Sequence, residues 1–164
     1  MENNKRDSLS IVVFTDDYDK AMAALVMATG AKAVGWDVTL YFTFWGLNLI
    51  TKRKLSGKYK RNLIQKLFGI INKPSISKAK LSKFNFGGIG KGMLEILLKQ
   101  KKIPNLKELF DYANQLGVKI VACSLAMQVF GLSKDDLEDF VKEVVDVPEY
   151  LRIAKESSIA HFIA

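Results

Sequence analysis

The chain has 164 residues, of which 49% are hydrophobic and 26% charged, so it holds enough apolar material for the core of one domain. Its single cysteine excludes an internal disulfide framework, and its single histidine, His161, leaves too few ligands for a zinc site or a histidine-based triad. We therefore expect one domain over residues 1–164, with no cofactor and no metal. The polar start lacks a signal-peptide pattern, and the longest apolar run, 38–50, is shorter than the ~20 residues of a membrane-spanning helix, which predicts a cytoplasmic protein.

The basic residues are concentrated in the middle of the chain. Residues 51–102 contain 15 lysines and arginines against one acidic residue, Glu95, whereas the rest of the chain contains 10 basic and 16 acidic residues. This concentration indicates either a solvated lysine-rich surface or an acidic partner, such as nucleic acid, a membrane surface, an anionic substrate or an acidic protein. Because the aromatic residues of the segment do not alternate with arginines as in ribonucleoprotein motifs, we expect no nucleic-acid partner.

The hydrophobic pattern predicts strands that alternate with helices. In chain order we expect a strand over 10–15, a helix over 17–34, a strand over 36–43, helices over 62–71, 91–102 and 105–116, a strand over 118–123, a short helix over 124–130, a helix over 133–143, a strand over 144–147, a helix from Pro148 and a strand over 158–163. The order predicts a single-domain, flavodoxin-like α/β fold: an open, mostly parallel five-stranded sheet with helices on both faces. Residues 51–90 form a basic insertion after the second strand, and an insertion of this length is more often functional or mobile than idle.

Ligands of an open parallel sheet bind beyond the carboxyl ends of its strands, near a topological switch point. Cys123, at the end of the third strand, is the nucleophile among the residues expected there. At the start of a helix its thiolate would be favoured by the backbone amides of the turn that holds Ser124 and Leu125, and lysines of the insertion would act in the same direction. The alternative is a buried and inert cysteine. The residues expected to line a pocket around the thiol are Asp16, Thr43, Phe44, Trp45, Gly46, Met127 and Gln128.

Three further features carry alternative interpretations. Gly87, Gly88 and Gly90 with Lys91 form either a backbone nest for an anion or a flexible hinge before a helix. The aromatic run over 42–47 is explained by core packing, or by the lining of an apolar pocket or a subunit contact. Asp16 and Asp17 are interpreted as helix caps rather than general bases.

Three motifs resemble the DsrE/DsrF-like superfamily, and more narrowly its DsrE-type branch, which is sometimes labelled a peroxiredoxin family. They are the stretches over 41–49 (YFTFWGLNL), 83–90 (KFNFGGIG) and 121–131 (VACSLAMQVFG), and the resemblance covers residues 10–164. It implies a flavodoxin-like fold, assembly into homo-oligomers such as trimers or hexamers, and sulfur trafficking in the cytoplasm. The cysteine that matches Cys123 carries sulfur as a persulfide or S-thiosulfonate in such proteins, and exchanges it with TusA-like carriers or rhodaneses.

The chain departs from this pattern at three positions. Gln128 stands where many relatives have an acidic residue, which puts in doubt a carboxylate beside the thiol; Phe86 and Ile89 stand where methionines are common. Peroxiredoxin chemistry is not supported, because the chain has neither a Thr-x-x-Cys run nor a resolving cysteine.

The leading hypothesis is therefore a sulfur-relay protein that uses Cys123, either as a sulfurtransferase or as a stoichiometric carrier. Two alternatives remain. One is an adaptor that docks through its basic insertion and aromatic residues on an anionic membrane surface, as a peripheral contact, or on a partner complex. The other is a thiol-dependent redox sensor.

Overall fold

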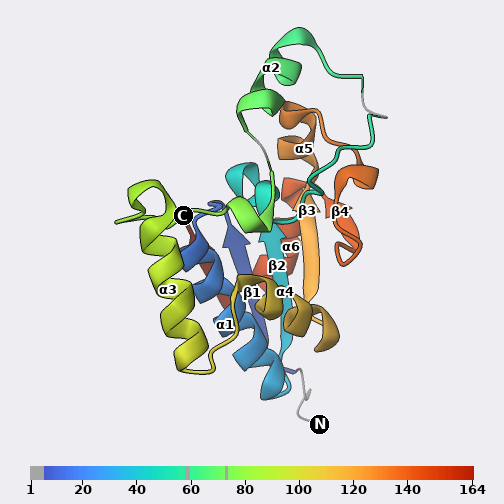
Figure 1. Ribbon diagram of the computed structural model, residues 1–164. Coiled ribbons are helices and arrows are strands. Elements are labelled where there is room, and N and C mark those ends of the chain that lie inside the picture. The colour runs from blue at the N-terminus through green and yellow to red at the C-terminus, as the bar shows by residue number, and fades with distance from the viewer. Residues whose placement is uncertain (1–5, 58–59, 73) are drawn as a thin grey trace.

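Five parallel strands form one sheet in the computed structural model (Figure 1), which describes residues 6–57, 60–72 and 74–164. Residues 58, 59 and 73 of the predicted insertion, and 1–5 of the polar start, lie outside the described residues. The strand order is β4-β3-β2-β1-β5, which confirms the predicted α/β fold with a parallel five-stranded sheet. The strands are β1 (Ser8–Val13), β2 (Asp37–Phe42), β3 (Lys119–Cys123), β4 (Glu143–Val145) and β5 (Ile159–Ile163).

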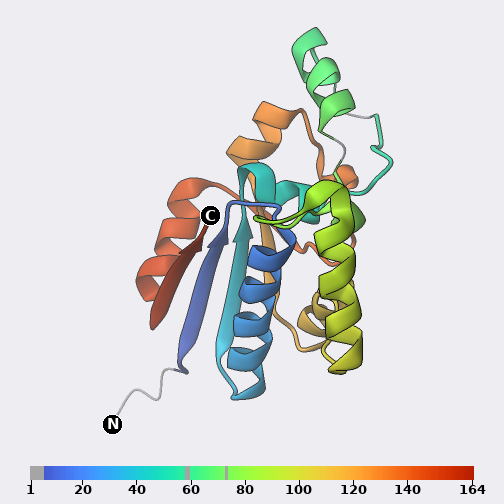
Figure 2. The ribbon, with the colours of Figure 1, turned by 60° about the vertical axis from the view of Figure 1, so that its left-hand side comes forward.

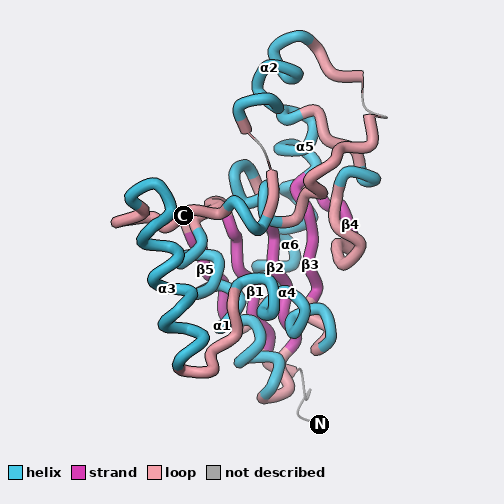
Figure 3. Tube along the Cα trace, in the orientation of Figure 1, coloured by secondary structure: helices cyan, strands magenta, loops and turns pink. Residues whose placement is uncertain are grey.

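Helices cover both faces of the sheet. The α-helices are α1 (Tyr18–Ala33), α2 (Leu63–Ile71), α3 (Ile89–Gln100), α4 (Leu106–Gln115), α5 (Ser124–Phe130) and α6 (Val147–Glu156), and the 3₁₀ turns are η1 (Phe44–Leu49), η2 (Ile76–Lys78), η3 (Phe86–Gly88) and η4 (Lys134–Asp136). Figure 2 shows α1 and α3 on one side of the strands and α6 on the other. Helices α2 and α5 lie beyond the carboxyl ends of the strands, where β2 and β3 lead directly into η1 and α5 (Figure 3).

Alternation along the strands separates the two faces. Ile11 and Leu40 are paired in register and point to the face that α1 and α4 cover. On the same face, the ring centroids of Phe42 and Phe110 in α4 are 5.9 Å apart. The neighbouring positions face α6 instead, and there Tyr41 stacks on Tyr150. The residues of β2 and β3 that share the alternation of Tyr41 therefore point to the α6 face.

The topological switch of the sheet falls between β1 and β5. The chain moves outward in one direction from β1 to β4 and then returns through α6 to the far side of β1. Cys123, at the end of β3, therefore lies two strands away from the crevice in which open sheets commonly bind ligands.

One predicted element is wrong. The helix expected over 133–143 ends after one turn, η4, although the expected capping box of Ser133 and Asp136 is present. Leu137 has extended dihedral angles and forms an antiparallel bridge with Thr51, so a tertiary contact takes the backbone that the helix would have used. Among the described residues, no helix has the length and apolar character that crossing a membrane requires.

Candidate functional site

Cys123 is the last residue of β3 and the residue that precedes α5. Its side chain is 1% exposed, so the thiol is enclosed by the fold rather than presented at the surface. Tyr41 is paired in register with Val121, and Cys123 follows Val121 by two residues, so the thiol points to the same face of the sheet as the Tyr41 side chain. The expected position at a strand end before a helix is present, whereas the open access expected for a nucleophile is not.

Tyr41 lies beside the thiol on the α6 face and has further polar neighbours, Tyr150 and Asp146. Burial, followed by the adjacent Cys123 thiol and the charge of Asp146, raises the pKa of the Tyr41 hydroxyl far above its usual range. Tyr41 and Tyr150 are both buried, and their rings stack with centroids 4.2 Å apart and planes 9° apart. Asp146 is the N-cap of α6, and its carboxylate accepts a hydrogen bond from the backbone N–H of Glu149. The charged group next to this pair is thus an acid, not one of the expected lysines.

Helix α2 of the basic insertion holds the opposite end of α5. The Nε of Arg61, just before α2, donates a 2.7 Å hydrogen bond to the carbonyl oxygen of Gly131, which ends α5. The side-chain amide of Gln65 donates to the carbonyl oxygens of Gln128 and Val129. The insertion therefore contacts the C-terminal end of α5, while Cys123 is at its N-terminal end.

The predicted residues of α5 differ in exposure. Met127 is buried and Ser124 is partly buried, whereas Leu125 and Gln128 are exposed. Only the backbone of Gln128 has a role that the structure shows, as the acceptor for Gln65. Its side chain does not lie in the core beside the thiol.

Asp16 belongs to a hydrogen-bonded network that we had not predicted. Its carboxylate accepts from the amide of Asn48, which is buried in η1, and Asn48 exchanges two 2.9 Å hydrogen bonds with Asn72 at the end of α2. Asp17 occupies the N-cap position of α1, but its side chain forms no capping hydrogen bond and pairs with Lys20 instead. Asp17 is therefore the cap residue of α1 without a capping hydrogen bond, whereas Asp16 is not a cap and links the end of β1 to the insertion.

The turn that follows β2 is held to β1 through the backbone of Thr43 and Gly46. The N–H groups of both residues donate to the end of β1, Thr43 to Val13 and Gly46 to Phe14. A Cβ atom at Gly46 would overlap the carbonyl oxygen of Val13, so no other residue fits without a shift of the backbone.

Aromatic rings form a row along the carboxyl edge of the sheet. The ring centroid of Phe44 lies 5.3 Å from that of Phe14 and 6.5 Å from that of Phe130, and the centroids of Trp45 and Phe130 are 5.7 Å apart. The row continues from Phe14 to Phe162 in β5 at 6.0 Å. Phe44 and Trp45 thus pack against α5 and also keep part of their surface exposed.

The glycine-rich segment lies apart from Cys123, on the other side of the carboxyl edge (Figure 1). The N–H groups of Gly88 and Gly90 both donate to the carbonyl oxygen of Asn85, and Gly87 and Gly88 have positive φ. The ammonium group of Lys91 donates to the carbonyl oxygen of Ser77. These groups serve the start of α3, and the structure does not bring them to the thiol.

A groove between α3, α4 and η2 does not include the thiol. It has a volume of about 1030 Å³ and is lined by parts of α3, α4 and η2, with Lys91 as its only predicted site residue. Its lysines alternate with carboxylates such as Glu95 and Glu108, so it carries no strong single charge. The groove is not the expected pocket around Cys123.

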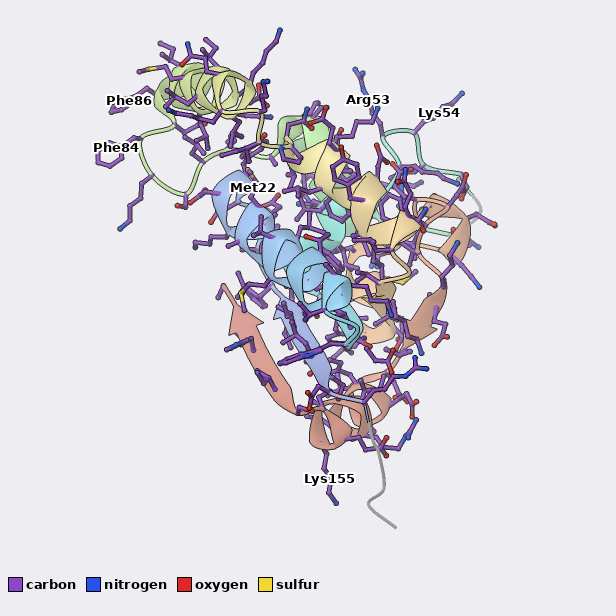
Figure 4. The ribbon with its side chains drawn as sticks, turned by 90° about the horizontal axis from the view of Figure 1, so that it is seen from below. Met22, Arg53, Lys54, Phe84, Phe86 and Lys155 are labelled. Atoms are coloured by element: carbon purple, nitrogen blue, oxygen red, sulfur yellow. The ribbon has the colours of Figure 1, made fainter. Side chains whose placement is uncertain are left out.

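The basic residues do not gather into one patch. Figure 4 shows Arg53 and Lys54 projecting from one side of the molecule, whereas α3, which carries Lys91 and Lys99, lies on the opposite side. Lys52 is paired with Asp139 at 2.8 Å. The charge concentration of the sequence is therefore distributed over separate surfaces.

Sequence reasoning did not identify Tyr41 or Tyr150 as neighbours of the thiol. Alternation in β2 places Tyr41 on the same face as residues 39 and 37, but the strand register that sets it beside Cys123 is not visible in the sequence. Tyr150 is more than 100 positions from Tyr41, and no local signal connects the two.

Comparison with known proteins agrees with the fold of a parallel sheet covered by helices. The profile of the DsrE/DsrF/DrsH-like family matches residues 5–162, and the chain belongs to this family. It is 39% identical over 162 residues to the uncharacterized protein YrkE of Bacillus subtilis, covering 99% of both chains. It is 26% identical over 171 residues to the sulfur carrier protein DsrE2 of Allochromatium vinosum, covering 99% of this chain and all of the relative.

Two solved structures share the fold. The YchN protein of E. coli has a TM-score of 0.56 at 12% identity and covers 96% of this chain and 99% of its own. MTH1491 of Methanobacterium thermoautotrophicum, a protein of unknown function, has a TM-score of 0.53 at 13% identity and covers 94% of this chain and 98% of its own. At this level of identity the similarity concerns the fold alone.

Proposed function

We propose that the protein is a cytoplasmic sulfur-relay protein in which Cys123 accepts sulfur from a donor and passes it to the thiol of a partner. The observation that carries the proposal is the position of Cys123, the only cysteine of the chain, at the β3–α5 junction of a DsrE/DsrF/DrsH-like fold. A relative aligned over nearly the whole chain is named a sulfur carrier protein, which supports the same role.

The chemistry needs only a thiolate and a sulfur donor. The Cys123 thiolate attacks the outer sulfur of a donor persulfide, an S–S bond forms to Cys123, and the S–S bond of the donor breaks to release its thiolate. With tetrathionate, attack on an inner sulfur gives a Cys123 S-thiosulfonate and releases thiosulfate. Attack by the partner's thiolate on the bound sulfur then releases the Cys123 thiolate, so no external reductant is consumed.

Burial of the thiol sets a condition on this exchange. A partner's sulfur cannot reach an atom that is 1% exposed, so α5 must move away from the end of β3 during transfer. Helix α5 suits this movement because it has seven residues and its last carbonyl groups are held by side chains of the insertion rather than by the sheet. Its exposed Leu125 lies next to the junction and would contact the partner.

The partners in this proposal are a rhodanese-type donor and a TusA-like carrier, as the resemblance of the motifs implies. A homo-oligomer, such as a trimer or a hexamer, is part of the same proposal. The exposed ends of the aromatic row, Trp45 and Phe162, are surfaces that a subunit or a carrier would cover.

Loading of the purified protein tests the proposal. Incubation with polysulfide or tetrathionate, followed by intact mass measurement, should add one sulfur or one thiosulfonate group to the wild type and nothing to Cys123→Ser. No adduct on the wild type, or the same adduct on both proteins, would contradict the proposal.

A second candidate function is docking on an anionic membrane surface, and the surface around the start of α3 favours it. Phe84 and Phe86 are 75% and 70% exposed and project from the molecule (Figure 4), and both are held at positive φ, which is costly for a bulky residue. Exposed Ile89 and Met93 of α3 continue the apolar surface, and Lys83 adjoins it. Exposed aromatic residues beside lysines suit an interface with anionic lipids.

A further inference from the structure

The hydroxyl of Tyr41 is a buried donor that interacts with the Cys123 thiol but meets no acceptor at full hydrogen-bond geometry among the described residues. The residue is 4% exposed. Buried hydroxyl groups are normally paired, because an unpaired one loses its hydrogen bonds to water and gains none in return. An unpaired hydroxyl beside a cysteine therefore points to a form of that cysteine that accepts a hydrogen bond.

The position of the hydroxyl is fixed by the fold. Strand register places Tyr41 on the same face of the sheet as Cys123, on the neighbouring strand. The ring cannot turn away, because it lies flat against the ring of Tyr150 at 4.2 Å and α6 covers it. The donor is thus held in one place next to the thiol.

The protonation state of Cys123 determines how strong a hydrogen bond the Tyr41 hydroxyl can form with its sulfur. A neutral thiol is a weak acceptor, whereas a thiolate or a persulfide anion is a charged acceptor that forms a short, strong hydrogen bond. Because burial, ahead of the neighbouring thiol, raises the pKa of Tyr41 far above its usual range, its hydroxyl keeps its proton at neutral pH and remains a donor. The donor therefore favours the charged form of the sulfur.

We propose that the Tyr41 hydroxyl donates a hydrogen bond that stabilises the anionic sulfur of Cys123. The sulfur is first the thiolate that attacks the sulfur-supplying molecule, and then the bound persulfide. This assignment rests on the proposed sulfur relay and adds the group that makes an enclosed thiol reactive. No proton leaves Tyr41 in either step: its O–H donates and stays intact, while the S–S bonds form and break at Cys123.

The other side chains around the pair do not supply such a donor. Asp146, the N-cap of α6, brings a negative charge that opposes the thiolate, and Tyr150 of α6 brings a second hydroxyl on the other ring of the stack. From β4, Val145 is the register partner of Cys123 and carries no polar side chain. Neither η1 nor α5 contains a charged residue. Tyr41 is therefore the group that we expect to lower the cost of charging the sulfur.

The single cysteine allows its ionisation to be followed directly. NMR of the protein with isotope-labelled cysteine reports the titration of Cys123 in the closed fold, with no need for a reagent to enter. Tyr41→Phe keeps the ring and its stack and removes only the hydroxyl, so we expect the midpoint to rise by about one pH unit, the effect of one hydrogen bond to a charged group. Tyr150→Phe removes a hydroxyl from the other ring of the same stack and should leave the midpoint unchanged.

A second substitution tests the same donor in the opposite direction. A ring-fluorinated tyrosine at position 41 has a more acidic hydroxyl and donates a stronger hydrogen bond, so it should lower the midpoint. An unchanged midpoint in Tyr41→Phe, or equal shifts in Tyr41→Phe and Tyr150→Phe, would overturn the assignment. The titration uses no sulfur donor, so this failure differs from a failure of Cys123 to load sulfur, which would overturn the proposed function instead.

Discussion

Arg61 reaches across from the insertion and donates a 2.7 Å hydrogen bond from its Nε to the carbonyl oxygen of Gly131, the residue that ends α5. Gly131 has a positive φ of 66°, and the contact satisfies a carbonyl group at a helix end that has no partner within the helix. Together with Gln65, Arg61 couples the basic segment to the short helix that begins directly after Cys123. In the proposed relay, in which α5 moves away from the thiol, this contact would hold α5 in the closed position.

Loss of this contact should make Cys123 more accessible. We expect Gln65→Ala to raise the rate at which iodoacetamide alkylates Cys123 in the native protein by about threefold, and Arg61→Ala by about tenfold, because each removes hydrogen bonds that exist only in the closed state. Lys66→Ala is the matched control: it removes an exposed charge from the same helix, and the rate should not change. Equal rates in all four proteins would show that α2 does not control access.

Gly46 should tolerate no side chain. Because its Cβ would meet the carbonyl oxygen of Val13, Gly46→Ala must displace η1 from the end of β1, and we expect a loss of about 2 kcal/mol or more in the free energy of unfolding. Gly30→Ala in α1 is the control, since nothing lies within 4 Å of its Cβ position and alanine favours helix. Urea denaturation of both variants measures the difference, and equal stability would contradict the close approach of the two turns.

Asp136 should make the stability of the protein depend on pH. Burial alone would raise the pKa of its carboxyl group, but hydrogen bonds from Ser133 and Ser56 outweigh burial and hold the pKa below its usual range. A carboxyl group with a lowered pKa in the folded state stabilises the protein above the pKa of the unfolded state, about 4, and this stability is lost as the pH falls through the folded-state pKa.

Asp136→Asn should therefore destabilise the protein by about 2–3 kcal/mol at pH 7, and the difference from the wild type should shrink as the pH falls below about 4. Thermal unfolding of both proteins across this range measures it. Asp135→Asn, next to it in the chain but exposed, serves as control. A difference that is independent of pH would show that the carboxylate charge of Asp136 is not what holds the loop.

Membrane docking should depend on the two exposed phenylalanines before α3. We expect the wild type to bind vesicles that contain anionic lipids at low salt, and to lose most of this binding when Phe84 and Phe86 are both changed to serine or when salt is raised. Phe162→Ser removes an exposed aromatic residue from β5 and should bind as the wild type does. Vesicle sedimentation measures binding, and salt-insensitive or absent binding would remove this candidate function.

The elements could be predicted where the signal is local. The β-branched run before Asp16, the capping residue Asn105 and the glycine after Phe130 all mark boundaries that the structure has within a few residues. The order of strands and helices then defined the fold class, because alternating elements of this length favour a parallel sheet.

The site was predicted less completely, because its contacts join distant parts of the chain. Cys123 was identified from its place after a strand, but its neighbour Tyr41 comes from β2 and is stacked on Tyr150, more than 100 positions further along the chain. The helix expected after Ser133 fails for a similar reason: Asp136 binds Ser56, 80 residues away, and Leu137 pairs with Thr51. Long-range packing of this kind leaves no periodic pattern in either partner.

Transfer of sulfur from loaded protein is the most direct test of the relay. Wild-type protein that carries one extra sulfur is freed of donor and mixed with a protein that has one accessible thiol, and the intact masses of both are followed. The relay predicts that the sulfur leaves Cys123 and appears on the acceptor in equal amount. Sulfur that stays on the loaded protein, or that leaves as free sulfide while the acceptor mass does not change, would contradict it.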